Sequence, residues 1–453
     1  MHTKPINKAL WILLALMFSV MVKAQYTVSG GNGTPLLAND DTRDRLQVYL
    51  VSGMSGVTIK YEGTTAKHQW YRYKTKALEP EAIPSVQNGT TSTVSNLTEG
   101  YGYFVQEEGV LSRYVWIIDY SLYPFALSNL RVSSSSDGCS TILLASDSEL
   151  PHMYFYTPSG VQTELKRTMT VSYNTLEWNE DAKSFSDKKS EVTLSGNPFT
   201  QSVPAPLCDT EICLSPDTYA EHFGIGQSVC TDTYASLAVE LHADTSMVSE
   251  TAENMYTGDD GLSAPVTVHF RAVANDPVAS LYIWKIFQAD TTQKDQDITA
   301  TEPLVRYTGP EIDYTFANAG EFVAQVEVSD RSGTCTTSEQ FSLSISESYL
   351  KVPNVFSPGT TPGINDEFRV AYKSLTSFHC WIFNRWGKQL YEWTNPAEGW
   401  DGKQGGGYID PGVYFYVIEA KGSDGKKYKK SGDINVLRSK SGIASGTSTT
   451  PTN

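Results

Sequence analysis

The sequence has 453 residues, of which 51 are Asp or Glu and 35 are Lys or Arg, for a formal net charge of −16. From residue 350 onward there are 13 Lys and Arg against 9 Asp and Glu, a net charge of +4, so the acidic excess lies in the earlier part. Nucleic acid requires basic patches, so this composition argues against nucleic acid as a partner. The chain is too long for one β-sandwich and suits three or four domains of about 90 to 120 residues.

The first 24 residues have the pattern of a secretory signal peptide. Lys4 and Lys8 precede an apolar run at 9–22, and Ala24 is a small residue before an expected cleavage at Gln25. The run is short for a membrane span, and polar sequence follows it. No later apolar stretch approaches spanning length. We therefore expect export across the inner membrane and no membrane span in the mature chain.

Residues 25–132 predict a first, immunoglobulin-like β-sandwich. The expected strands, separated by Gly-, Ser-, Thr- and Pro-rich turns, are Leu46–Val51, Val57–Tyr61, His68–Tyr73, Tyr101–Gln106 and Tyr114–Asp119. Trp70 and the later Tyr101 and Tyr103 are similar to the core tryptophan and tyrosine corner of immunoglobulin-like domains, without their cysteine pair. These aromatics are expected in the core or half-buried, because side chains alternate along a strand. An exposed, sugar-binding aromatic face is the alternative.

Two further β-domains are expected before residue 348. The serine-rich run from Ser133 to Gly138 marks the start of a second β-domain at 133–227, and a third occupies 228–347. Their expected strands are Ile142–Ala145, Met153–Tyr156, Met169–Tyr173, Tyr234–Leu241, Val266–Ala272, Leu281–Phe287 and Phe322–Val328. In the third domain, Trp284 and the run from Tyr314 to Asp330 resemble the PKD-type immunoglobulin-like fold, which implies a spacer or binding module. The predicted fold class is all-β, with tandem immunoglobulin-like β-sandwich domains.

Residues 348–440 predict a compact β-domain with six landmarks in order. They are VPNVFSPG (352–359), NDEF (365–368), NRWG (384–387), WDG (400–402), GVYFYVI (412–418) and GDINVLR (432–438). Together these landmarks resemble the C-terminal domain of proteins exported across the outer membrane by the type IX secretion system, in its gliding-motility-associated, type B form. Residues 441–453 are rich in Ser, Gly, Thr and Pro and are predicted to be disordered.

The resemblance implies a cell-surface protein that stays associated with the outer membrane. Its partners would be the type IX secretion machinery and an outer-membrane barrel of the PorP/SprF kind. The residues of the motifs that this machinery would read are Asn384, Arg385, Trp386, Gly387, Trp400, Asp401, Gly402 and Gly432.

The NRWG and WDG motifs also have a purely structural interpretation, in which two turns are pinned by core tryptophans. Asn384 and Asp401 would hold backbone turns, and Arg385 would pair with a carboxylate. Gly387 and Gly402 would supply positive φ angles. Near the tail, Lys426, Lys427, Lys429 and Lys430 would either dock on an acidic partner or form a solvated hairpin.

The cysteines are predicted to form disulfides that cross-link the domains, because an exported protein meets an oxidising compartment. We expect Cys230 to pair with Cys335, and Cys139 to pair with Cys208 or Cys213. Cys380 lies among apolar residues and is expected as a buried free thiol. Metal binding is not predicted. Cys208 and Cys213 lack a second pair at zinc-finger spacing, and the loop 359–368 lacks the earlier acid that many related domains carry there.

No catalytic constellation emerges from the sequence. The seven histidines are scattered, and none lies in a zinc-protease motif or near a nucleophile elbow. No phosphate loop or cofactor fingerprint is present, so no cofactor is predicted. The favoured function is a non-catalytic structural or accessory component of the secretion or motility apparatus. A surface adhesin that binds glycan or host protein through its N-terminal domains is the alternative, and a secreted hydrolase is the least favoured.

Overall fold

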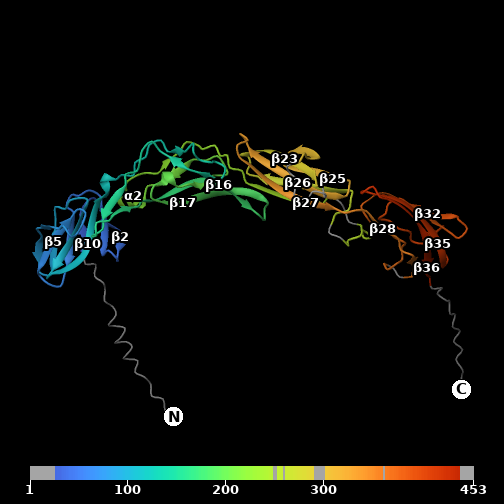
Figure 1. Cartoon of the computed structure of the whole chain (residues 1–453), viewed down its shortest axis with the longest axis horizontal. Helices are drawn as coiled ribbons and strands as arrows, with labels where there is room; N and C mark the ends of the chain where they lie inside the picture. The colour runs from blue at the N-terminus through green and yellow to red at the C-terminus, as the bar shows by residue number, and fades with distance from the viewer. Residues whose placement is uncertain (1–25, 248–251, 259–260, 290–300, 361–362, 439–453) are drawn as a thin grey trace, which may run out of the picture. The chain divides into compact units, whose positions relative to one another are not determined.

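The computed structural model describes residues 26–247, 252–258, 261–289, 301–360 and 363–438 (Figure 1). These residues form an all-β fold of tandem β-sandwiches, as predicted, with one short α-helix in the described part, α2 (Thr218–Phe223). The chain divides into two compact units. Unit 1 holds the residues up to 177 and 186–236, and unit 2 holds residues 178–185 and those from 237 onward. The predicted signal peptide, 1–24, and the tail, 441–453, lie outside the described residues.

The first part of unit 1 is a sandwich of two sheets. The strand orders are β1-β4-β8-β7 and β2-β3-β10-β9-β5-β6, and β3 runs parallel to β10. The strands are β1 (Tyr26–Ser29), β2 (Leu36–Asp41), β3 (Leu46–Val51), β4 (Thr58–Glu62), β5 (His68–Tyr73), β6 (Glu81–Ile83), β7 (Val86–Asn88), β8 (Thr91–Val94), β9 (Tyr101–Glu107) and β10 (Val110–Asp119). The predicted strands Leu46–Val51 and His68–Tyr73 are therefore confirmed.

The six-stranded sheet buries both of its faces. Trp70 and Ile117 belong to a core that also contains Tyr26, from β1 of the opposite sheet. Trp116, on the other face of β10, belongs to a second core that continues through Val171 and other residues beyond position 132. This explains why the sequence of β3, LQVYLV, is apolar without clean alternation. One hydrophobic core thus runs from the first sandwich into the segment that follows it.

The rest of unit 1 consists of small sheets around this second core. The pairs are β11-β13, β12-β18 and β14-β15, and the four-stranded order is β17-β16-β19-β20. The strands are β11 (Arg131–Val132), β12 (Thr141–Ile142), β13 (Leu144–Ala145), β14 (Met153–Tyr156), β15 (Gln162–Leu165), β16 (Thr168–Asn179), β17 (Ser184–Ser195), β18 (Val203–Pro204), β19 (Ile212–Leu214) and β20 (Val229–Cys230). Short 3-10 helices follow β10 and β17, at Tyr120–Leu122 and Pro198–Thr200.

The predicted disulfide pairings are wrong. Cys213 and Cys230 lie directly opposite each other on β19 and β20, with 4.0 Å between their Cα atoms, and form a disulfide. Cys230 is therefore not bonded to Cys335, and Cys139 is bonded neither to Cys213 nor to Cys208, which is a free thiol. The error arose because the strand expected at 234–241 does not form, and β20 instead completes a sheet of unit 1.

A buried ion pair lies beside the second core of unit 1. Arg167 donates to Asp217 at 2.5 Å, and its second terminal nitrogen donates to the carbonyl oxygen of Tyr123 at 2.6 Å. Asp217 also accepts from the hydroxyl of Tyr120 at 2.8 Å and caps helix α2 through the N–H of Ala220 at 3.1 Å. Buried side chains from three distant parts of the sequence are thereby joined.

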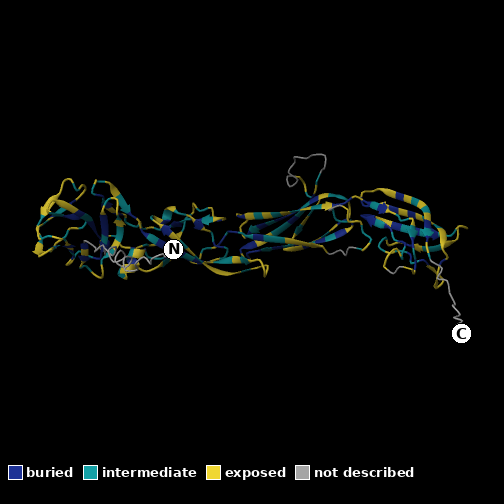
Figure 2. Ribbon diagram, turned by 90° about the horizontal axis from the view of Figure 1, so that it is seen from below, coloured by how far each residue is buried: buried dark blue, intermediate teal, exposed yellow. Residues whose placement is uncertain are grey.

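Unit 2 begins with a sandwich of two antiparallel sheets, β21-β22-β25 and β24-β23-β26-β27. The strands are β21 (Leu241–Met247), β22 (Val266–Ala274), β23 (Ala279–Gln288), β24 (Val305–Thr308), β25 (Glu311–Phe316), β26 (Gly320–Asp330) and β27 (Thr336–Ile345). Burial alternates strictly along β22, and Trp284 on β23 lies fully inside this core. Trp284 is therefore the core residue that the sequence predicted. Figure 2 shows the ribbon coloured by burial, with buried, intermediate and exposed residues interspersed along the strands.

The second part of unit 2 contains a five-stranded sheet of order β29-β36-β35-β31-β32 and the pairs β28-β30 and β33-β34. The strands are β28 (Tyr349–Lys351), β29 (Val355–Phe356), β30 (Ala371–Lys373), β31 (Leu375–Phe383), β32 (Gln389–Trp393), β33 (Lys403–Gln404), β34 (Gly407–Tyr408), β35 (Gly412–Gly422) and β36 (Lys427–Val436). Its core includes Trp400 and Cys380. Cys380 is a buried free thiol, as predicted, and burial raises its pKa.

We expect Asp217→Asn to lower the free energy of unfolding of unit 1 by about 3 to 5 kcal/mol, because Arg167 would remain buried without its counter-charge. The amide oxygen of Asn would still cap helix α2, so the loss reports the charge and not the cap. Urea denaturation of the full chain, monitored by a signal that reports on unit 1, measures this loss in the free energy of unfolding. Asp187→Asn, at an exposed site in the same unit, is the control. Equal midpoints for both variants would contradict the prediction.

Candidate functional site

The NRWG motif forms a tight turn between β31 and β32. The side-chain oxygen of Asn384 accepts from the N–H groups of Trp386 and Lys388, both at 3.0 Å, and so holds the turn as predicted. Gly387 has a φ of +78°, a left-handed conformation that glycine adopts without strain. Arg385 lies with its guanidinium carbon 4.8 Å from the centre of the Trp386 ring. The predicted partner of Arg385 was a carboxylate, whereas the structure pairs it with this ring.

The prediction that Trp386 is a core residue is wrong. Trp386 is 78% exposed, whereas Trp400 is 0% exposed. The core beneath this hairpin is already filled by Cys380, Ile382 and Trp393, so the turn projects Trp386 away from it. The turn therefore leaves a large apolar ring exposed to solvent.

The WDG motif has a structural role, with Trp400 in the core and Asp401 at its surface. The indole N–H of Trp400 donates to the carbonyl oxygen of Lys403 at 3.1 Å, and its ring packs 5.6 Å from that of Phe356. Asp401 accepts from the N–H of Lys403 at 3.0 Å, which is the predicted turn cap. Gly402 has a φ of +73°, and a Cβ there would lie 2.7 Å from Pro358. A glycine is thus required at position 402, because a side chain would be strained at this φ and would clash with Pro358.

Gly432 and the lysine cluster also have structural contacts. A Cβ on Gly432 would lie 2.8 Å from the hydroxyl oxygen of Tyr416, so the strand approaches that ring closely. Lys429 pairs with Glu419 at 3.2 Å, and Lys430 donates to the carbonyl oxygen of Leu350 at 2.9 Å. These contacts are typical of a solvated hairpin edge.

The outer face of the five-stranded sheet carries an apolar patch. Val413, Phe415 and Val417 alternate along β35 with residues of the core, and all three are exposed. The half-buried Trp381 and Phe383 lie opposite Val417 and Phe415 on β31. We call these five residues the outer apolar face. Sequence reasoning missed it, although the exposed set recurs at every second residue of GVYFYVI.

The loop before β30 contains one hydrogen bond to a side chain and one between backbone groups. The N–H of Gly363 donates to Asp366 at 2.9 Å, and the N–H of Ser357 donates to the carbonyl oxygen of Asn365 at 2.6 Å. Across the described residues, no group of three or more His, Cys, Asp or Glu side chains is arranged to hold a metal ion.

One arrangement in unit 1 has the composition of a catalytic triad. His68 lies 2.8 Å from the hydroxyl of Ser92 and 3.6 Å from a carboxylate oxygen of Glu107. Ser92 is buried, however, and its oxygen accepts a hydrogen bond from the indole N–H of Trp70 at 2.8 Å, so its hydroxyl is not exposed as a nucleophile would be. Burial opposes ionisation of Glu107, but hydrogen bonds from Thr65, Tyr61 and Thr64 outweigh it and lower the pKa of Glu107 to about 2. The group holds a loop in place.

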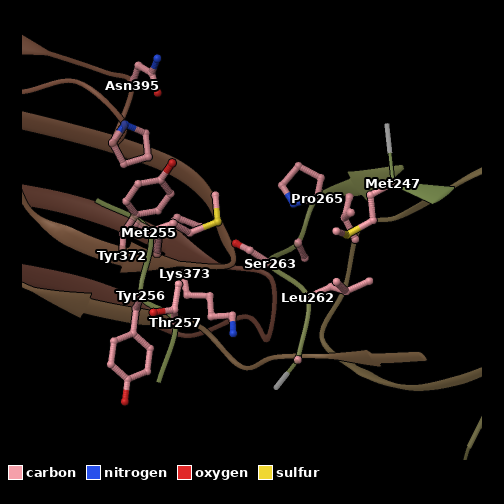
Figure 3. A pocket seen from close by; sticks show the side chains of 15 residues that line it. Met247, Met255, Tyr256, Thr257, Leu262, Ser263, Pro265, Tyr372, Lys373 and Asn395 are labelled. Atoms are coloured by element: carbon pink, nitrogen blue, oxygen red, sulfur yellow. The ribbon is translucent and has the colours of Figure 1, made fainter. Parts of the chain in front are cut away.

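A cavity of about 370 Å³ lies in unit 2 beside Met247, Met255, Leu262 and Tyr372 (Figure 3). Apolar side chains form most of its wall, and Ser263 and Asn395 add polar groups. Its volume is within the range of small-molecule sites.

Two segments match known families. Residues 131–231 match a fibronectin type III domain family, Fn3_FA. Residues 350–436 match the CHU_C type IX secretion signal domain. Residues 350–436 are a type IX secretion signal domain. This signal domain contains the NRWG turn and the outer apolar face, and it marks the chain for export by the type IX secretion system to the cell surface.

Two solved structures align with much of this chain at low identity and low TM-score. A tetra-tandem repeat from the extending region of a large adhesion protein aligns with 86% of this chain and 99% of its own, at 10% identity and a TM-score of 0.19. The chicken CNTN1 FN1-FN3 domains align with 68% of this chain and 98% of their own, at 9% identity and a TM-score of 0.20. No curated protein matches the sequence. None of the helices in the described segments is long and apolar enough to cross a membrane.

Trp400 and Trp386 are expected to contribute differently to the stability of unit 2. Trp400→Ala should lower the free energy of unfolding of unit 2 by about 3 to 5 kcal/mol, because it empties a buried site. Trp386→Ala should change it by less than about 0.5 kcal/mol, because that ring is exposed. Urea denaturation of both purified variants against the wild-type chain is the measurement. Similar losses for the two variants would show that Trp386 is a core residue after all.

Acidic pH should lower the free energy of unfolding of unit 1, partly through protonation of Glu107. The pKa of Glu107 is lowered from 4.5 to about 2, so its contribution to stability is complete above pH 4.5 and is lost as the pH falls towards 2. Glu107→Gln should flatten the pH dependence of unfolding in this window, while the exposed-site variant Glu108→Gln should keep the wild-type slope. Urea midpoints between pH 2 and 6 give both slopes. A wild-type slope for Glu107→Gln would contradict the contribution of Glu107 to the pH dependence of unfolding.

Proposed function

We propose that this protein is a non-catalytic cell-surface protein, held at the outer membrane through its secretion signal domain by a barrel of the PorP/SprF kind. In this role it acts as a structural or accessory component of the secretion or motility apparatus. The observation that carries the proposal is the outer apolar face together with Trp386. An exposed aromatic group of this kind, on a domain with its own filled core, is typical of a protein contact surface.

The contact surface has a defined chemistry. Phe415 is 42% exposed and lies opposite Phe383, so two phenyl rings are neighbours across β31 and β35. His379 stacks on Trp381 with 3.8 Å between ring centres and extends the aromatic surface along β31. Trp386, with Arg385 beside it, lies at the tip of the hairpin that ends β31. Tryptophan and arginine are the residues that most often dominate binding energy at protein interfaces.

The non-catalytic role is supported by the two family matches, one to a fibronectin type III family and one to a secretion signal. The Ser92, His68 and Glu107 group adds support because its serine is buried. The adhesin alternative depends on an exposed aromatic face in the first sandwich. Trp70, Tyr73 and Tyr103 are buried there, and Tyr71 and Tyr101 are half-buried, so these aromatic residues expose little surface for that alternative.

The test compares surface retention of full-length variants in the native host. Phe415→Ser and Trp386→Ser should each release about tenfold more protein into the medium and reduce co-purification of an outer-membrane barrel to a similar degree. Leu281→Ser, at an exposed apolar position on β23 of the other sandwich, is the matched control. A chain that stops after Ser346 lacks the export signal and gives only the background for co-purification of the barrel. Wild-type retention of both face variants, with their folding verified by thermal unfolding, would refute the proposed attachment.

A further inference from the structure

A short segment of the sandwich in unit 2 pairs with the secretion signal domain. Residues 252–256, between β21 and β22, lie along β30, and we call them the strap. The N–H of Tyr256 donates to the carbonyl oxygen of Tyr372 at 2.8 Å, and the N–H of Tyr372 donates to the carbonyl oxygen of Asn254 at 3.3 Å. Met255 and Tyr372 form a parallel bridge. Since β28 pairs with β30 to form a two-stranded sheet, the strap adds a bridge to a further edge of β30.

The side chain of Asn254 fastens the strap to two separate segments of the signal domain. Its amide nitrogen donates to the carbonyl oxygens of Val370 and Pro396, both at 2.8 Å. Val370 lies just before β30 and Pro396 follows β32, so both carbonyls lie outside the strands and each accepts a hydrogen bond from Asn254. Glu253 adds an exposed ion pair with Arg369 at 2.9 Å, which contributes little by comparison.

Apolar contacts and a second attachment accompany the strap. Met255 packs against the core of the signal domain, and the ring of Tyr256 stacks on that of Tyr349 with 4.2 Å between centres. Further along the same connection, the N–H of Ser374 donates to the hydroxyl of Ser263 at 2.8 Å. The hydroxyl of Ser374, a buried residue, in turn accepts from the N–H of Ala264 at 3.1 Å.

From these contacts we infer that the export signal of this protein is composite: the strap of the preceding sandwich is a structural part of it. The matched segment, 350–436, leaves the β30 edge and the carbonyl groups of Val370 and Pro396 without the partners that the strap supplies. The signal domain therefore reaches its complete fold only when the sandwich that carries the strap is in place. This inference rests on the identity of the signal domain and is independent of the proposed barrel attachment.

The first test measures hydrogen–deuterium exchange in the purified full-length chain. Asn254→Ala removes both side-chain hydrogen bonds, and Tyr256→Pro removes the N–H that bonds to Tyr372. Each should accelerate exchange of the peptide spanning 370–374 about tenfold and leave β22 and β23 unchanged. Glu253→Ala, which removes only an exposed ion pair of the strap, is the matched control. Unchanged exchange at 370–374 in both variants would overturn the inference that the strap stabilises β30. Unchanged exchange in β22 and β23 would show that the sandwich stays folded.

The second test follows export of the same full-length variants to the cell surface. Asn254→Ala and Tyr256→Pro should lower surface-exposed protein about tenfold and accumulate protein in the periplasm, while Glu253→Ala should behave as wild type. Faster exchange combined with wild-type export would overturn the composite signal. Failure of the barrel attachment would instead appear as exported protein in the medium, so the two proposals fail in different compartments.

Discussion

Each β-strand must bury the side chains on at least one face and find partners for the backbone groups along its edges, and the whole structure depends on how these two needs are met. In unit 1 the central strands of the six-stranded sheet are buried on both faces, and the core on one of these faces is shared by the first sandwich and the fibronectin-like segment. The buried pair of Arg167 and Asp217 lies beside this core. In the signal domain, the edge of β30 is completed by a segment from the preceding sandwich.

The five-stranded sheet of the signal domain has one face whose described residues include the exposed Val413, Phe415 and Val417, and this asymmetry is the basis of the proposed function. Trp400 and Trp386 occupy similar short motifs, yet one ring fills the core and the other lies in solvent. Trp400 therefore maintains the shape of the domain, whereas Trp386 and the outer apolar face are available to a partner. The same type of residue contributes to folding in one place and to recognition in the other.

The family boundaries and the structural boundaries differ in both units. The fibronectin type III match begins at residue 131, but the core of that segment includes Trp116 and Ile118 of β10. The secretion signal match begins at residue 350, but residues 252–256 complete its small sheet. Sequence families record segments that are contiguous along the chain. A packed core or a strand pairing joins segments that are distant along it.

The sequence by itself determined the all-β class, the six landmarks of the signal domain, the positive φ angles of Gly387 and Gly402 and the turn role of Asn384, because alternation, turn chemistry and capping are local. It also indicated the buried thiol of Cys380. Tertiary structure decided the pairing of Cys213 with Cys230, the exposure of Trp386 and the partner of β30. Each of these depends on which strands become neighbours and on how much core volume is already filled. Those quantities are set by contacts between distant residues, which a local pattern does not encode.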